Sequence, residues 1–407
     1  MKTVMVLGVG AQGSTIAKRL NDESAVETVI CADYDEKAVA EMENSLSKAR
    51  GVKVDARSVD AVVEAAQGAE LIVNGLSPDF NLNVLEACLR VGACYQDMAS
   101  GPVSDVDFVE AVRRVLAYSE KFEAAGLSAL INTGSAPGLA NVITRESVEQ
   151  MDSCDAIEIF VYDGVWSKTF IPFWWSPQTA FGDMAAEPIV FKDGAFIRTD
   201  PFNDPRDVDF VGLGKRRIVD HEHEEPVTMG LLADSVLKGV KYVNFRYGGP
   251  ALELAESLYK MGLLSDEPVD VKGTAVVPMD LISKLTPPAP KYPEEIRAVL
   301  DEGMVSEEGA FLVRVDGVKD GKKVRIDSYA NAPGLSEAFE KSQLTHESYL
   351  TGQSAFLFTK MFVNGVIETR GVFPPEVLGA GEREYYFSEA AKLDITVDQY
   401  VRTRLDD

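Results

Sequence analysis

A glycine pattern near the start of the chain constrains its fold more than any other feature. Residues 8–13 read GVGAQG, a complete G-x-G-x-x-G pattern. An apolar run over residues 3–8 leads directly into it, and Ile16, Ala17 and Leu20 follow at helical spacing. In such a strand–turn–helix unit the first glycine makes the tight turn, the second lets the backbone approach a pyrophosphate, and the third lets helix and strand pack closely. The pattern therefore predicts that a dinucleotide-binding βαβ unit opens the chain.

The residues that would hold the dinucleotide extend from this turn to the end of the second strand. Its pyrophosphate is expected at the amide groups and positive dipole end of the first helix. Asp33 lies 20 residues after Gly13, where a carboxylate bonds the adenosine ribose hydroxyls. Because Tyr34 is not basic and two acidic residues follow it, a 2′-phosphate would be repelled, so NAD is favoured over NADP, with FAD a weaker alternative. The expected cofactor-binding residues here are Gly8, Gly10, Ala11, Gln12, Gly13, Asp33 and Tyr34.

The alternation of apolar runs and helical stretches continues to about residue 133. Connections of this length between short buried strands are typical of a doubly wound parallel sheet, so we expect an α/β Rossmann domain. The expected strands cover residues 3–8, 28–33, 52–56, 70–75, 93–97 and 127–133, and the expected helices 14–21, 36–47, 59–66, 81–91 and 106–125.

The pattern changes after this point. Longer strands are expected at 156–163 and 241–247, and Asp320-Gly321 supplies the turn of a hairpin between residues 309–318 and 322–329. These features predict an α+β second domain with a mainly antiparallel sheet. We therefore expect a Rossmann domain over 1–133, a substrate-binding domain over 134–347, and a C-terminal helical segment over 348–407 that packs back on the Rossmann domain.

Two further loops follow strands of the predicted parallel sheet, at the edge where such sheets bind ligands. The first contains Gly75 and Ser77 and is expected near the nicotinamide ribose. The second runs from Asn132 to Gly138, and Gly134 is its expected contact with the cofactor. A simple strand-to-helix turn is the alternative for this second loop.

Composition excludes several classes of partner. The 40 basic and 65 acidic side chains give a formal net charge of −25, which repels nucleic-acid phosphates. No apolar run reaches the roughly 18 residues that a membrane span needs. The four cysteines form no CxxC pair, which favours free thiols in a reducing compartment. We expect a cytoplasmic protein that binds neither nucleic acid nor membrane.

With these motifs in place, the chain resembles the saccharopine dehydrogenase-like family, which includes saccharopine reductases, lysine 6-dehydrogenases and carboxynorspermidine dehydrogenases. The resemblance implies a Rossmann domain, an inserted α+β domain for substrate binding and homodimer formation, and hydride transfer at a carbon–nitrogen bond of an amino-acid substrate. One departure is Arg246-Tyr247-Gly248-Gly249-Pro250, where lysine 6-dehydrogenases tend to have R-Y-P-G-H. The segments that carry the resemblance are residues 8–13, 92–97 (similar to the family's G-x-x-Y-x-D strand), 134–138, 245–249 and 371–376.

Four side chains are candidates for the chemistry. Asp97 ends the fifth strand and matches the family's aspartate; it is expected to act as base or ammonium anchor, with helix capping as the alternative. Arg246 is expected to hold a substrate carboxylate, with a surface or interdomain ion pair as the alternative. Trp174 and Trp175 lie in an aromatic segment flanked by prolines, which predicts either a lid over the nicotinamide or substrate, or a segment packed at an interdomain or dimer interface.

The remaining charged motif is His221-Glu222-His223-Glu224-Glu225. An H-x-H pair on a strand can bind metal, but no third ligand is suggested, so we expect no metal. His346 is expected at the surface or at an interface. No serine nucleophile, P-loop or zinc motif is present in the sequence.

Together these features predict an NAD(P)-dependent oxidoreductase acting on a CH–NH bond of an amino acid or amino-acid-derived amine. The expected reaction is oxidative deamination of the lysine 6-dehydrogenase kind. The alternatives are a saccharopine-type reductive condensation of an amine with a carbonyl acid, and a non-catalytic NAD-binding regulator.

Overall fold

The computed structural model describes residues 2–403, and these residues fall into two compact units. The first unit contains the residues up to Glu146 together with Leu350–Asp394, and the second contains Ser147–Tyr349 together with the residues from Ile395. Each unit is therefore built from two separate stretches of chain. The divisions at 146/147 and 349/350 fall inside two helices, residues 139–149 and 346–363, whereas the sequence places the boundaries at 133/134 and 347/348.

The first unit is a seven-stranded sheet with the order β17-β6-β5-β4-β1-β2-β3, and all its pairs are parallel. This confirms the doubly wound parallel sheet predicted from the sequence. Its strands are β1 (Lys2–Leu7), β2 (Val26–Asp33), β3 (Ala49–Lys53), β4 (Leu71–Asn74), β5 (Cys94–Asp97), β6 (Ser128–Leu130) and β17 (Gly371–Phe373).

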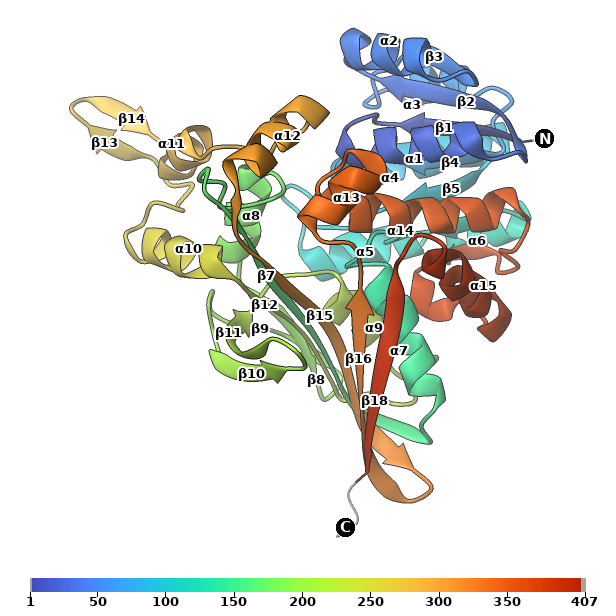
Figure 1. Cartoon of the computed structure of the whole chain (residues 1–407). Helices are drawn as coiled ribbons and strands as arrows, with labels where there is room; N and C mark the ends of the chain where they lie inside the picture. The colour runs from blue at the N-terminus through green and yellow to red at the C-terminus, as the bar shows by residue number, and fades with distance from the viewer. Residues whose placement is uncertain (1, 404–407) are drawn as a thin grey trace. The chain divides into compact units, whose positions relative to one another are not determined.

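Helices cover both faces of this sheet (Figure 1). Successive side chains of a strand point to opposite faces, and on β1 Met5 and Leu7 join one buried cluster while Val4 and Val6 join another. The helices of this unit are α1 (Ala11–Asp22), α2 (Glu36–Ser45), α3 (Val59–Ala65), α4 (Asn81–Val91), α5 (Phe108–Leu116), α6 (Ser119–Ala124), most of α7 (Leu139–Glu149), most of α14 (His346–Val363) and α15 (Ala380–Ala391), with short 3₁₀ turns η1 (Pro78–Phe80) and η2 (Pro375–Val377).

Helix α14 packs against α1, far from it in sequence. The Arg19 Nε donates to Gln353 Oε1 over 2.8 Å, and Ala355 and Phe356 share a buried cluster with Ile16 and Ala17. The C-terminal segment also supplies β17, which pairs with β6. Only three residues long, β17 carries no periodic pattern that could have predicted it.

The second unit contains a nine-stranded mixed sheet. Its main path is β10-β11-β12-β7-β15-β16-β18, with β8 paired to β12 and β9 paired to β8. Only the β12–β7 pair is parallel, which confirms a mainly antiparallel sheet. Its strands are β7 (Ser153–Ser167), β8 (Ile189–Lys192), β9 (Ala195–Arg198), β10 (Arg206–Phe210), β11 (Gly214–Asp220), β12 (Tyr242–Gly248), β15 (Met304–Lys319), β16 (Lys322–Asn331) and β18 (Thr396–Thr403).

The predicted hairpin is present between β15 and β16. Asp320 and Gly321 both have positive φ, 51° and 71°, as a two-residue turn of type I′ requires. The other elements of this unit are the exposed hairpin β13 (Val269–Val271) and β14 (Thr274–Val276), and the helices α8 (Pro177–Ala185), α9 (Glu225–Leu231), α10 (Pro250–Lys260), α11 (Pro278–Leu285), α12 (Pro293–Glu302) and α13 (Leu335–Ser342).

The expected C-terminal helical segment needs one correction. Residues 396–403 form β18, an edge strand paired antiparallel with β16 along its whole length. Its residues are exposed apart from one that is partly buried, so the segment lacks the apolar alternation that marks a half-buried strand. The backbone hydrogen bonds to β16, rather than burial of apolar side chains, hold this segment in the sheet.

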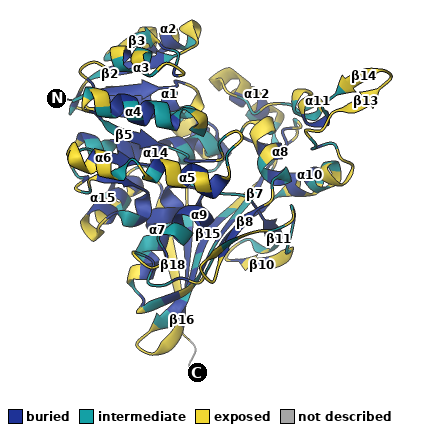
Figure 2. Ribbon diagram, turned by 180° about the vertical axis from the view of Figure 1, so that it is seen from behind, coloured by how far each residue is buried: buried dark blue, intermediate teal, exposed yellow. Residues whose placement is uncertain are grey.

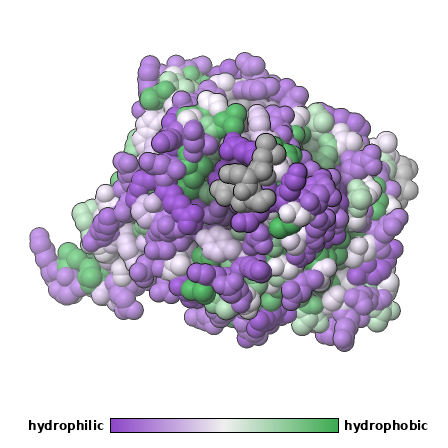
Figure 3. Space-filling view, turned by 90° about the horizontal axis from the view of Figure 1, so that it is seen from below, coloured by the Kyte–Doolittle hydropathy of each residue, from purple (hydrophilic) through white to green (hydrophobic). Residues whose placement is uncertain are grey.

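Burial differs between the two sheets. Most strand residues of the first sheet are buried, whereas β9 and β18 of the second sheet and the β13–β14 hairpin have no buried residue, and the outward faces of many helices are exposed (Figure 2). One face of the molecule is mostly hydrophilic, with apolar side chains in small separate patches (Figure 3). Among the described residues, no helix combines the length and apolar character that crossing a membrane requires.

Candidate functional site

The glycine turn lies between β1 and α1 and has three differently constrained positions. Gly8 has φ +89°, and a Cβ at Gly13 would lie 1.9 Å from the Gly8 carbonyl oxygen, so neither tolerates a side chain. A Cβ at Gly10, in contrast, would meet no atom within 4 Å. The fold itself therefore demands glycine at two positions, and open space at Gly10 leaves room for a group from outside the chain, as close approach of a pyrophosphate would need.

Asp33 is fixed at the end of β2 by two backbone amides. Its Oδ2 accepts from the Val9 N–H over 2.9 Å and its Oδ1 from the Asp35 N–H over 3.0 Å. A cavity of about 420 Å³ opens beside it, a size that suits a nucleoside. The cavity is lined by Leu7, Asp33, Tyr34, Val54, Asp55, Ala56, Arg57, Leu76 and Phe80. Carboxylate, cavity and glycine turn together fit the adenosine end of a dinucleotide.

Arg57 lines the same cavity, and no sequence motif indicates this position. It follows β3, and its guanidinium forms three hydrogen bonds with the Asp55 carboxylate, from Nε over 2.9 and 3.1 Å and from NH2 over 2.7 Å. Its side chain is 73% exposed. A basic side chain therefore lies in the same cavity as Asp33, but its guanidinium is already paired with the Asp55 carboxylate.

The loop after β4 packs directly on the glycine turn. A Cβ at Gly75 would lie 2.8 Å from the Gly8 carbonyl oxygen, so the close approach of the two loops depends on glycine. Ser77 precedes η1, and its hydroxyl donates to Asp79 over 3.2 Å. Both expected residues thus lie on a loop that touches the cofactor turn.

Asp97 ends β5 on the same edge of the sheet. Leu7, Asn74 and Asp97 are register partners on the neighbouring strands β1, β4 and β5, so their carboxyl ends meet. Asp97 is 1% exposed; its Oδ2 accepts from the Tyr95 hydroxyl over 2.8 Å and its Oδ1 from the Asn132 N–H over 2.7 Å. Burial raises the pKa of Asp97 to about 7, although both hydrogen bonds act to lower it.

The loop after β6 carries an amide side chain that sequence reasoning did not single out. Asn132 is fully buried with φ +61°, and within the described residues neither its Oδ1 nor its Nδ2 has a hydrogen-bond partner. The Gln12 Oε1 is another such atom, on the first turn of α1. Buried polar atoms without partners are costly, so both residues are candidates for contacts with a bound molecule.

The same loop is shaped by Gly134, a predicted cofactor contact. A Cβ there would lie 3.0 Å from the Pro137 carbonyl oxygen, and the Gly134 N–H donates to that same oxygen over 2.7 Å. The Ser135 hydroxyl lies 2.9 Å from that of Thr351 on α14. The loop is therefore a compact turn anchored to the C-terminal segment.

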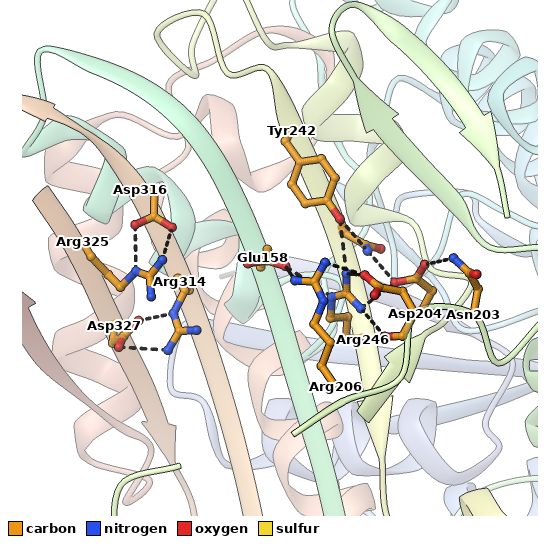
Figure 4. Close-up of polar contacts among 12 residues, drawn as sticks. Glu158, Asn203, Asp204, Arg206, Tyr242, Arg246, Arg314, Asp316, Arg325 and Asp327 are labelled. Carbon is orange, nitrogen blue, oxygen red and sulfur yellow. Dashed lines mark hydrogen bonds and ion pairs between the residues drawn. The ribbon is translucent and has the colours of Figure 1, made fainter. Parts of the chain in front are cut away.

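Arg246 differs from the expectation that it holds a substrate carboxylate. It is fully buried in β12 and forms ion pairs from NH1 to Asp220 (2.8 Å), from NH2 to Asp204 (2.9 Å) and from Nε to Glu158 (3.3 Å), as part of the network in Figure 4. A substrate carboxylate would have to displace one of these carboxylates. The ion pairs of the buried Arg246 lie within the second unit, whereas the alternative from the sequence is an ion pair at the surface or between domains. We propose no substrate contact for Arg246.

The two tryptophans have different surroundings. Trp174 is 3% exposed, its Nε1 donates to the Val165 carbonyl over 2.9 Å, and its ring packs in an apolar cluster with Ile171 and Phe339. It is therefore a core residue rather than part of a lid. Trp175 is partly exposed, and its ring meets Tyr247 edge to face at 5.9 Å, so its contact with substrate stays a prediction.

Phe245 and Tyr247 lie on the face of β12 opposite to Arg246. Several ionisable side chains gather beside them, and we call these residues the acidic–histidine cluster: Asp183 and His221–Glu225. The His223 ring stacks on Phe245 at 3.9 Å, and the His221 ring lies 5.2 Å from Tyr247. The His223 Nδ1 hydrogen-bonds to Glu225 and lies 3.6 Å from Glu224.

Burial and mutual charge perturb this cluster strongly. Burial lowers the pKa of His221 to about 3 and raises those of Asp183 to about 7 and Glu224 to about 8. For His223, burial lowers the pKa, but Glu225 and Glu224 outweigh it and bring the value to about 9. Ligand atoms of His223, Glu224 and Glu225 lie within 4.8 Å of one another, so the cluster has the spacing to surround a small cation.

Comparison with known proteins agrees with this architecture. A family model described as the saccharopine dehydrogenase NADP binding domain matches residues 4–130, and the saccharopine dehydrogenase C-terminal domain matches residues 134–390. The carboxyaminopropylagmatine dehydrogenase of Synechocystis is 25% identical over 390 residues, covering 92% of each chain. The carboxynorspermidine synthase of Vibrio alginolyticus is 25% identical over 355 residues, covering 83% of this chain and 80% of its own.

Solved structures share the fold. The apo saccharopine dehydrogenase (L-Glu forming) of Saccharomyces cerevisiae superposes with a TM-score of 0.66 at 14% identity, covering 99% of this chain and 100% of its own. The Legionella pneumophila homospermidine synthase, solved with NAD, gives a TM-score of 0.66 at 14% identity, covering 98% and 91%. With both family models matched and the pyridine-nucleotide cradle in place, the chain belongs to the saccharopine dehydrogenase family of NAD(P)-dependent oxidoreductases.

Proposed function

We propose that this enzyme catalyses reversible hydride transfer at the CH–NH bond of a secondary amine that carries a carboxylate. In the reductive direction an amine and a carbonyl acid condense with loss of water, and the resulting imine is reduced. The single observation that carries this proposal is Asp97, a buried carboxyl group that ends β5 in register with the ends of β4 and β1, beside the cofactor turn. The names of the two relatives, one a dehydrogenase and the other a synthase, denote carboxylated amines of this kind.

The residues of this chain supply binding and proton handling. When bound, the reduced nicotinamide supplies the hydride that reaches the imine carbon. Gly10 and α1 would hold the pyrophosphate and Asp33 the ribose. Asp97 would protonate the nitrogen as the carbon accepts hydride, and would take that proton back in the oxidative direction. Its pKa of about 7 makes both protonation states accessible near neutral pH, as a group with both tasks needs.

Oxidative deamination of a primary amine uses the same steps with ammonia in place of the second amine. The two reactions differ in the amine that they need. Condensation consumes reduced cofactor only when an organic amine is present with the carbonyl acid, whereas the reverse of deamination needs only ammonia with the carbonyl acid. We also propose that NAD is the preferred cofactor, because the Asp33 carboxylate would repel a 2′-phosphate and the nearby Arg57 is bound to Asp55.

The experiment is a turnover screen with the purified full chain, following absorbance of reduced nicotinamide. Diamines, amino acids and ammonia are each supplied with and without carbonyl acids, using NADH and NADPH separately. Consumption that requires both an organic amine and a carbonyl acid supports condensation, whereas consumption with a carbonyl acid and ammonia as the sole amine supports the reverse of deamination. Tight cofactor binding with no turnover on any pair would replace the proposal with a non-catalytic regulator.

Asp97→Asn tests the proton-handling role. Asn keeps the shape of the side chain but cannot exchange a proton, so we expect kcat to fall by roughly 100-fold or more, within the range that general acid–base groups contribute. The cofactor Kd should be unchanged. Glu110→Gln, an exposed change on α5 in the same unit, is the matched control.

A further inference from the structure

A charged pair lies in the cavity that fits the adenosine end of the cofactor. Asp55 and Arg57 both line this cavity, together with Asp33, and belong to the connection between β3 and α3. Among the described residues that line the cavity, Arg57 is the only base. Because Asp33 is expected to bind the ribose hydroxyls, Arg57 shares a cavity with the 2′ position, where NADP carries its extra phosphate.

The Asp55 carboxylate holds the Arg57 side chain in one place. Besides the three hydrogen bonds from the guanidinium, it accepts one from the Arg57 backbone N–H over 3.0 Å. Hydrogen bonds from Arg57 lower the pKa of Asp55 to about 2, so this carboxylate stays charged at neutral pH. The charge of Arg57 is therefore compensated by Asp55 rather than offered to a ligand.

The pair is also easy to break. The side chains of Arg57 and Asp55 are 73% and 39% exposed. Exposed ion pairs contribute little to stability, because water screens them and both side chains lose freedom when they pair. A guanidinium binds phosphate in the same two-pronged geometry as carboxylate. Arg57 can therefore exchange Asp55 for a phosphate that is placed within its reach.

A second exposed pair lies close by but outside the cavity. The Lys53 Nζ is 2.8 Å from the Glu36 Oε1 and 5.5 Å from the centre of the Tyr34 ring. Tyr34 lines the cavity, whereas the described lining includes neither Lys53 nor Glu36. This pair has the same charges as Asp55 and Arg57 without their position, so it offers a matched control.

We propose that Arg57 is a movable ligand for the 2′-phosphate of NADP, and that Asp55 favours NAD by holding Arg57 away from that phosphate. With NAD bound, the guanidinium stays on Asp55. With NADP bound, it exchanges the carboxylate for the phosphate. The inference rests on the proposed preference for NAD and gives it a second cause besides repulsion by Asp33.

Calorimetry with the full chain measures the Kd values of oxidised NAD and oxidised NADP without any turnover. Asp55→Asn keeps the shape of the side chain but removes the charge that holds Arg57. We expect NADP to bind roughly 10-fold more tightly to this variant, the value of a hydrogen bond to a charged group, while the Kd of NAD changes much less. The ratio of the two Kd values is the readout, because a general effect on the adenosine end cancels in it.

Arg57→Gln tests the phosphate ligand itself. This variant should bind NADP roughly 10-fold more weakly than the unmodified protein and NAD almost equally well. The double variant of Asp55→Asn with Arg57→Gln should bind NADP no more tightly than Arg57→Gln alone, because Asp55 acts only through Arg57. Such coupling between neighbouring residues is what a double-mutant cycle measures.

Glu36→Gln removes the same charge as Asp55→Asn from the pair outside the cavity, and should change the Kd ratio little. An equal change in Glu36→Gln and Asp55→Asn would reduce the effect to net charge and overturn the proposal. An unchanged ratio in Asp55→Asn would overturn it too, as would tighter NADP binding that persists in the double variant.

The inference and the proposed preference for NAD fail in different ways. An unmodified protein that binds NADP more tightly would contradict the preference, and loss of that tighter binding in Arg57→Gln would still support Arg57 as the phosphate ligand. A preference for NAD that neither Arg57→Gln nor Asp55→Asn alters would leave the preference standing and remove this role of the pair.

Discussion

Asp33 illustrates how a single side chain can be oriented before its ligand arrives. Backbone amides from Val9 and Asp35 each occupy one carboxylate oxygen, so the group has little rotational freedom to lose on binding ribose. A carboxylate oxygen has a second lone pair, which leaves each oxygen able to accept a ribose hydroxyl as well. We therefore expect the side chain both to hold the glycine turn in place and to bind the sugar.

Asp33→Ser is expected to raise the KM for NAD by roughly 10- to 100-fold, the value of hydrogen bonds to a charged group. Repulsion of a 2′-phosphate also falls, so the preference for NAD over NADP should shrink. Steady-state kinetics with both cofactors measures this, with the exposed change Glu41→Gln on α2 as control. An unchanged cofactor ratio would contradict our assignment of Asp33.

Tyr95→Phe gives a pH test of Asp97. The Tyr95 hydroxyl donates to Asp97 and lowers its pKa, so removing it should raise that pKa further. The oxidative reaction needs the carboxylate form of Asp97. The acid limb of its pH–rate profile should therefore move to higher pH, by on the order of one unit. Tyr118→Phe in the same unit is the control. A limb that stays in place would show that Asp97 has only a structural role.

At the level of elements, the glycine turn shows two different reasons for glycine, close packing of the backbone and access for a ligand, which the sequence pattern does not distinguish. The fold needs glycine at position 13, because a Cβ would lie 1.9 Å from a carbonyl oxygen, whereas position 10 has open space. A pattern match cannot distinguish packing from ligand access, but these distances can.

Two alanine variants test this separation. Gly13→Ala should destabilise the protein without cofactor by roughly 1–3 kcal/mol or more, the usual cost of overpacking. Gly10→Ala should leave that stability unchanged while weakening NAD binding severely, because the methyl group occupies the approach of the pyrophosphate. Thermal melts with and without NAD measure both effects. A stable Gly13→Ala variant, or full NAD binding by Gly10→Ala, would contradict the assignment.

Strand β12 shows what sequence reasoning could and could not supply. The sequence marks the motif around Arg246, but it does not show what each side chain contacts, because adjacent residues on a strand point to opposite faces of the sheet. Arg246 faces the ion pairs with Asp220, Asp204 and Glu158, while Tyr247 faces His221 and Trp175. Which face carries function depends on strands and loops distant in sequence. The cofactor turn was predictable because its strand, turn and helix are contiguous.

For the whole molecule, buried ionisable groups should tie stability to pH. The pKa of His223 is raised from its usual 6.5 to about 9, so its stabilising contribution is complete below pH 6.5 and is lost as pH rises through 9. The pKa of Glu224 is raised from 4.5 to about 8, so its contribution is complete below pH 4.5 and is lost through 8. His221, with a lowered pKa, acts in the opposite sense but only below pH 6.5.

Between pH 6.5 and 9 the free energy of unfolding should therefore fall as pH rises. Glu224→Gln, which preserves the uncharged form, should flatten the decline by an amount on the order of 1–2 kcal/mol. Chemical denaturation at several pH values measures this, with Glu294→Gln, an exposed change on α12 in the same unit, as control. A decline equally steep in Glu224→Gln would show that this carboxyl group titrates normally.

The two-stretch construction of each unit has a consequence for how the protein is made. Nascent chains generally begin to fold from the N-terminus, one domain at a time. Here the first sheet lacks its edge strand β17, and α1 lacks its partner α14, until residues up to 394 have left the ribosome; the second unit then waits for β18. The two units therefore become complete within a few residues of each other, and a chain interrupted before residue 371 lacks a strand of both sheets.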